Sequence, residues 1–137
     1  MAYAVVADLI ARYGEDELIQ LTDRIGAGTV DPAIAARALQ DAASEIDGYL
    51  AVRHTLPLSS VPQLLVRVAC DIARYRLWED RASDEVRIRY EDARRILEGL
   101  ASGRVSLGVT PPGAPAGPIA SARPGRNVFG GAAMDGY

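Results

Sequence analysis

The last 35 residues of the chain, 103–137, limit its fold more than any other feature. They contain eight of the thirteen glycines and five of the eight prolines. At this density neither a helix nor a sheet is maintained, so we expect no separate core in this segment. The rest of the chain is long enough for one ordinary domain. We therefore predict a folded body, residues 1–102, followed by an extended, irregular C-terminal arm, residues 103–137.

The arm ends in large apolar side chains, and these indicate that it docks on another subunit. Simple disorder is common at chain ends, but it gives no reason for apolar residues at the far end. Fully extended, the arm would reach roughly 110 Å, which is enough to cross a neighbouring subunit. The predicted anchors are Val128, Phe129, Met134 and Tyr137, and Arg123 and Arg126 are the predicted charge contacts.

Charge is divided unevenly between the body and the arm. The body carries twelve arginines against seventeen acidic residues, a net charge of −5, and the arm carries three arginines against one acid, a net charge of +2. A basic arm on an acidic body favours attraction between copies of the protein or to an acidic partner. A nucleic-acid-binding protein normally has a concentrated basic face, which this distribution does not provide.

The sequence carries no recognisable motif for catalysis, metal binding or cofactor binding. Its single cysteine, Cys70, excludes an internal disulfide and a multi-cysteine zinc site. Its single histidine, His54, has no second ligand or nucleophile at a recognisable spacing. We therefore expect no enzyme and no cofactor. No signal peptide and no bilayer-spanning apolar stretch are visible, so we expect a soluble intracellular protein.

Residues that cap helices and residues that end them predict two short helices at the start of the body. The first spans residues 9–13, with Asp8 as its cap, and Gly14 stops it. The second begins at Glu15, where three consecutive acids suit the positive end of a helix dipole. The glycines at positions 26 and 28 are predicted to end it.

Three longer helices follow. The third runs from Pro32 to about Val52, because Asp31 is an N-cap and proline is favoured at the first helical position. The fourth begins at Pro62, and the fifth lies between the cap Ser83 and the stop Gly103. No stretch alternates with the period of a strand, so the predicted fold class is an all-α helical bundle. The apolar stripe of the third helix is formed by Ile34, Ala38, Leu39, Ala42, Ile46, Tyr49 and Leu50.

Charged residues on the last two helices allow more than one interpretation. Asp71 lies between Arg67 and Arg74 on the fourth helix, and the simplest interpretation is an intrahelical ion pair worth a few tenths of a kcal/mol. The sharper interpretation is an intersubunit charge contact. The four arginines within residues 87–95 are interspersed with acids, which favours a solvated face of mixed charge over a track for phosphates.

Short groups of residues along nearly the whole chain match one known family. None is diagnostic alone, but their order and spacing are specific. By these groups the chain resembles the Mu-like phage neck proteins, also called head–tail adaptor or head-completion proteins. The groups include Asp8-Leu9, Arg12-Tyr13-Gly14, Glu45-Ile46-Asp47, Leu56-Pro57-Leu58, Asp71-Ile72-Ala73-Arg74-Tyr75, and Arg126, Phe129 and Gly136-Tyr137 at the end.

The resemblance implies a small helical adaptor made in the host bacterial cytoplasm and placed at the head–tail interface of the virion. About twelve copies would form a homo-oligomeric ring beneath the portal protein, which the arm would grip. The ring would also contact the next neck or tail component, and DNA would pass through its channel without sequence-specific binding. No membrane is implied. The alternative from another class is a helical DNA-binding or packaging accessory protein.

Overall fold

The structure is a computed structural model that describes residues 2–108. The expectation of an all-α body with two short and three long helices is confirmed, and the described residues contain no strand. The arm from residue 109 onward lies outside the described residues, and with it all six predicted arm contacts. The helices are α1 (Val6–Tyr13), α2 (Glu15–Thr22), α3 (Pro32–Leu50), α4 (Gln63–Trp78) and α5 (Asp84–Ser102), with a 3₁₀ turn, η1 (Glu79–Arg81), after α4.

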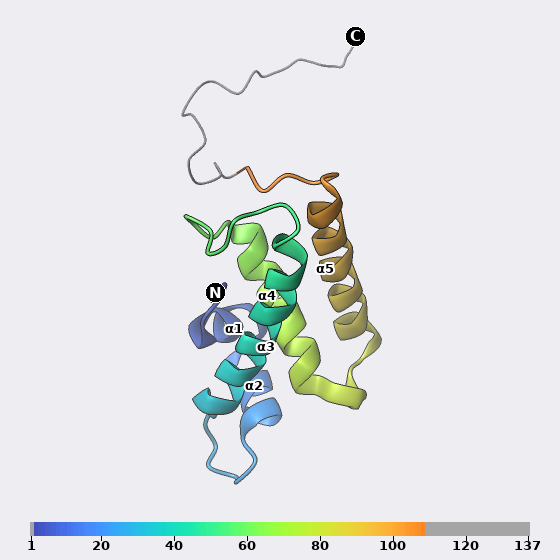
Figure 1. Ribbon diagram of the computed structural model, residues 1–137. Helices are drawn as coiled ribbons and strands as arrows, with labels where there is room; N and C mark the ends of the chain where they lie inside the picture. Colours follow the sequence, from blue (N-terminus) through green and yellow to red (C-terminus); the bar gives the residue numbers. More distant parts are fainter. Residues whose placement is uncertain (1, 109–137) are drawn as a thin grey trace, which may run out of the picture.

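The three long helices pack side by side, and the two short ones cover one side of them (Figure 1). Helices α3 and α5 run in the same direction, and α4, which connects them in the chain, runs in the opposite direction (Figure 1). Helix α4 contacts every other helix of the body. Helices α1 and α2 pack on α3 and α4, away from α5. The body is therefore a layer of long helices with a short helical pair on the side away from α5.

Small side chains form much of the interface between the long helices. Ala35 and Ala42 of α3 and Ala73 of α4 are completely buried. Because alanine is small, two helix backbones can approach closely, and the core between them is densely packed. The predicted stripe of α3 is buried except for Ile34 and Tyr49, which are partly exposed. Ala35 and Ala43 are buried as well, which the stripe did not include.

The predicted start of α3 and both predicted ends of α5 are confirmed, whereas α3 ends at Leu50, two residues before Val52, and α4 begins at Gln63 with Pro62 as its N-cap. The side chain of Asp31 accepts hydrogen bonds from the backbone N–H groups of Ala33 and Ile34, so it caps α3. The Ser83 hydroxyl accepts from the N–H of Val86 at the start of α5. Gly103 ends α5 with φ of 85°, a left-handed conformation that glycine adopts without strain.

Two predictions about the short helices were wrong. Helix α1 begins at Val6, and Asp8 lies within its first turn, where it accepts a hydrogen bond from the N–H of Val5 at 2.9 Å. Helix α2 ends at Thr22, well before the glycines at positions 26 and 28. The reason is Asp23, whose carboxylate accepts from the N–H groups of two residues in the following loop, Ala27 and Gly28. This Asx-type turn competes successfully with further helix.

The first residues of the predicted arm contact the body. The Val105 N–H donates to the carbonyl of Gly99 at 3.1 Å. A Cβ atom on Gly99 would lie 2.8 Å from the Val105 side chain, so that side chain lies directly over the helix. Leu107 also packs against the core. The chain therefore stays on the body as far as these residues.

Candidate functional site

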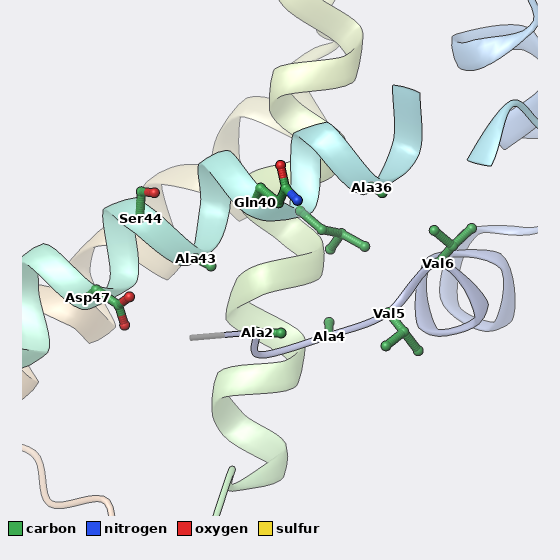
Figure 2. Close-up of a pocket in the computed structure, with 10 residues that line it drawn as sticks. Ala2, Ala4, Val5, Val6, Ala36, Gln40, Ala43, Ser44 and Asp47 are labelled. Carbon is green, nitrogen blue, oxygen red and sulfur yellow. The ribbon is translucent and has the colours of Figure 1, made fainter. Parts of the chain in front are cut away.

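An apolar groove of about 530 Å³ lies between the N-terminal segment, residues 2–6, and the outer face of α3. Figure 2 shows the segment passing alongside α3, with Asp47 at one end of the groove and Ala36 and Val6 at the other. Its wall on α3 is formed mainly by short side chains. The lining residues are Ala2, Ala4, Val5, Val6, Ala36, Leu39, Gln40, Ala43, Ser44 and Asp47.

Tyr3 holds the N-terminal segment against α3. Its ring is buried, and its hydroxyl donates a hydrogen bond to Asp47 Oδ1. Burial raises the pKa of Tyr3, and the hydrogen bond to the Asp47 carboxylate and its negative charge raise it further. Because successive side chains of an extended segment point to opposite sides, burial of Tyr3 leaves Ala2 and Ala4 facing the groove.

The groove is lined mostly by apolar side chains. Among the described residues that line it, Asp47 is the only one with an ionisable side chain. Val5 lies at the rim with 58% of its surface exposed. Such a concave, mostly apolar surface with a few polar groups accepts an apolar side chain and orients it through the polar ones.

A buried polar cluster fixes the two short helices to α4. Arg74 donates to both carboxylate oxygens of Glu17, from Nε to Oε2 at 2.7 Å and from Nη2 to Oε1 at 3.0 Å. The Trp78 indole N–H donates to the same carboxylate at 3.3 Å. The guanidinium of Arg74 also lies 4.3 Å from the centre of the Tyr13 ring. A bidentate Arg–carboxylate pair whose guanidinium stacks on an aromatic ring holds the three side chains in a defined orientation.

The predicted charge group at Arg67, Asp71 and Arg74 is divided between different partners. Asp71 forms the expected pair with Arg67, at 3.9 Å, and also accepts a hydrogen bond from the Tyr13 hydroxyl at 2.6 Å. Arg74 pairs with Glu17 on α2, so the intrahelical interpretation was wrong for this arginine. Asp71 and Arg74 are buried, whereas the Arg67 side chain is 49% exposed. The intersubunit contact stays a prediction, and Arg67 is the residue best exposed to make it.

The pKa values in this cluster follow its burial and charges. Burial raises the pKa of Tyr13, and the hydrogen bond to Asp71 and its charge raise it further. Burial lowers the pKa of Arg74, but the hydrogen bond and charge of Glu17 outweigh this and the net shift is upward. Both groups are therefore held in their ordinary protonation states at neutral pH.

A second polar cluster joins the three long helices. Glu45 of α3 accepts from Arg76 of α4 at 2.6 Å and from the hydroxyl of Tyr90 of α5 at 3.2 Å. The ring of Tyr90 stacks on Tyr75 with centroids 4.1 Å apart. Sequence reasoning did not single out Glu17 or Glu45 as structural ligands. Their partners lie 57 and 31 residues away along the chain, and no local spacing reveals such pairs.

The single cysteine, possible metal ligands and possible membrane-spanning helices can also be located in the described part of the chain. Cys70 is completely buried, and burial raises the pKa of its thiol to about 12. Residues 2–108 contain no group of three or more His, Cys, Asp or Glu side chains that could hold a metal ion. Among the helices described, none has the length and apolar character needed to cross a membrane.

Together the fold and the groove define a small all-α body with an apolar groove on one side. Comparison with known proteins then gives its family: the model for "Bacteriophage Mu, Gp36" matches residues 3–122, and the chain belongs to this family. It is 45% identical over 108 residues to "Mu-like prophage FluMu protein gp36" of Haemophilus influenzae, covering 79% of this chain and 77% of that protein. It is 43% identical over 110 residues to "Gene product J" of Escherichia phage Mu, covering 80% and 78%. The expected relation to Mu-like phage proteins is confirmed.

Proposed function

We propose that this chain is a structural virion protein, a head–tail connector adaptor that forms a ring under the portal. The ring extends the DNA channel and joins the head to the next neck or tail component. Membership of a Mu phage family places the chain among phage proteins. The observation that carries the adaptor role is the arm, whose glycines and prolines prevent a core of its own while its end is rich in apolar anchors.

The arm is proposed to dock on the portal protein through Phe129 and the neighbouring anchors. Burial of one large apolar side chain contributes about 1.5–3 kcal/mol. Repetition of the same contact around a ring multiplies the effect through avidity, since all copies are tethered together. The arm starts at the end of the body where α5 finishes (Figure 1). That end of the body is therefore proposed to face the portal.

The charge pattern of α5 supports this role over the DNA-binding alternative. Arg87 pairs with Asp84 at 3.0 Å, Arg89 pairs with Glu85 at 3.3 Å, and Arg94 pairs with Glu98 at 3.8 Å. Arginines that are already neutralised by neighbouring acids release few counterions from DNA, so they contribute little to phosphate binding. An acidic body instead lets DNA slide through a channel. In a mobility-shift assay at moderate salt we expect no shift, and a salt-sensitive shift would favour the accessory-protein alternative.

The experiment that tests the adaptor role is removal of the arm. A chain that ends after Gly108 keeps Val105 and Leu107, which contact the body, so we expect its circular dichroism and melting temperature to match the full chain. We expect this truncated chain to fail to join heads to tails in an assembly assay. The full chain with Phe129→Ala should join them less well. Normal joining by the truncated chain would contradict the proposal.

A further inference from the structure

Two exposed apolar features lie on opposite sides of the body. One is the groove on α3. The other is Ile88 of α5, which is 51% exposed. It lies two residues from both Val86 and Tyr90, which face the core, and two helical residues rotate the direction of a side chain by about 200°. Ile88 therefore projects outward from the bundle.

The groove lies on the side of α3 that faces away from α5. Glu45 points toward α5, because it accepts from the hydroxyl of Tyr90. Ala43 and Asp47, which line the groove, are each two residues from Glu45 and so lie about 200° around the helix from it. One molecule thus presents a concave apolar surface on one side and a protruding apolar side chain on the other. Complementary features on different faces of one subunit give a head-to-tail contact, and such a contact forms a ring when the rotation between neighbours closes and an open filament when it does not.

The direction of the helices allows these two surfaces to meet in parallel. Helices α3 and α5 run the same way within one body (Figure 1). A rotation about an axis along the bundle preserves that direction, so α5 of one copy would lie parallel to α3 of the next. Side chains at equal sequence spacing on the two helices would then be opposite each other.

The charges match in this register. Arg95 is seven residues after Ile88, and Asp47 is seven residues after Gln40, so both pairs are about 10.5 Å apart along their helices. With Ile88 over Gln40, Arg95 of the second copy lies opposite Asp47. The Arg95 side chain is 67% exposed, and its pair with Asp92 on α5 is a surface pair that contributes little stability. Asp47 already accepts from Tyr3, and a carboxylate accepts several hydrogen bonds. Charge complementarity of this kind fixes register.

We propose that the groove of one copy receives Ile88 and the outer face of α5 of a second copy of this chain, and that repetition of this contact builds the ring. This inference rests on the proposed function, which it deepens by naming the two surfaces that join neighbouring copies. The apolar contact supplies attraction, and the Arg95–Asp47 pair sets the register.

Disulfide cross-linking of the purified full chain tests the contact. The double variant Gln40→Cys with Ile88→Cys carries one thiol on each surface, at positions that lie opposite each other in this register, and both parent side chains are exposed. Under mild oxidation at high protein concentration, we expect a ladder of dimers, trimers and larger species on a non-reducing gel. Each single variant should stay monomeric, because residue 88 never meets residue 88 in a head-to-tail contact. The parent chain, whose only thiol is buried, is the background control.

Two further substitutions in the double-cysteine chain separate the groove from the rest of the surface. Ala36→Arg fills the groove and should reduce the ladder at least tenfold. Ile25→Arg, at a side chain 89% exposed in the loop between α2 and α3, should leave it unchanged. No ladder, or equal dimerisation of the Ile88→Cys single variant, would overturn the proposal. If the chain forms the ladder but fails to join heads to tails, the adaptor role is rejected and this contact stands. If the chain joins heads to tails but forms no ladder, this contact is rejected and the adaptor role stands.

Discussion

Arg74 of α4 binds Glu17 of α2 through two parallel hydrogen bonds, 2.7 and 3.0 Å long, while its guanidinium stacks on the Tyr13 ring of α1. One arginine thus fixes both short helices to the central helix of the bundle. The pair is largely removed from water, with the arginine side chain 10% and the glutamate side chain 21% exposed. Loss of either partner would leave the other charge poorly compensated.

Arg74→Met should destabilise the body by about 3 kcal/mol, because it leaves the Glu17 carboxylate with only the Trp78 indole as a hydrogen-bond donor. Arg89→Met removes an arginine whose partner is exposed on α5, and its cost should stay below about 0.5 kcal/mol. Urea unfolding followed by circular dichroism measures both. Equal losses in the two variants would show that the buried pair is no stronger than a surface pair.

Ala42→Leu should destabilise the body by about 1–3 kcal/mol. Ala42 is completely buried in the interface of the long helices, where a larger side chain forces the backbones apart. Ala33→Leu is the matched control, since Ala33 is exposed on the same helix. The same unfolding experiment applies to both. No loss of stability in Ala42→Leu would contradict the close packing of α3 at this position.

The stability of the body should fall as the pH rises above about 10, the ordinary pKa of tyrosine. The pKa values of Tyr3 and Tyr13 are raised in the folded state, so the unfolded chain loses these protons first. Each such tyrosine then lowers the free energy of unfolding by about 1.4 kcal/mol per pH unit, until the folded group also ionises. Tyr13→Phe should show a shallower decline between pH 10 and 11 than the parent chain. Identical slopes would mean that Tyr13 ionises with equal ease in both states.

Cys70 should react with a thiol reagent only when the body unfolds. The side chain is completely buried and its thiol pKa is raised to about 12, so the reactive thiolate is scarce at pH 8. We expect the labelling rate in native buffer to be at least a hundredfold lower than in 6 M urea, which follows from the small population of the unfolded state. Arg74→Met should label faster in native buffer. A native rate close to that in urea would contradict the burial of Cys70.

The helices were predictable from the sequence because their signals are local. Asp31 with Pro32, and Ser83 with the acids that follow it, mark helix starts through groups only a few residues apart. The end of α2 was predicted wrongly because a side chain competed with the helix. Asp23 binds the N–H groups of Ala27 and Gly28, and this ends α2 before the glycines do.

The groove and the polar clusters were not predictable in the same way. The groove forms because Tyr3 reaches Asp47 across 44 residues of sequence, which positions the N-terminal segment beside α3. The partnership of Arg74 with Glu17 spans 57 residues and depends on how α2 packs on α4. The prediction of the arm depends on composition alone, because its glycines, prolines and terminal apolar residues are visible without any fold.

The most direct test of the adaptor role is electron cryomicroscopy of intact particles of the phage that encodes the chain, with the neck resolved. We predict a ring of copies of the five-helix body directly beneath the portal, with the Phe129 segment of each copy in contact with the portal surface. Particles whose neck lacks this polypeptide, or a ring in which the Phe129 segment makes no contact with the portal, would contradict the account.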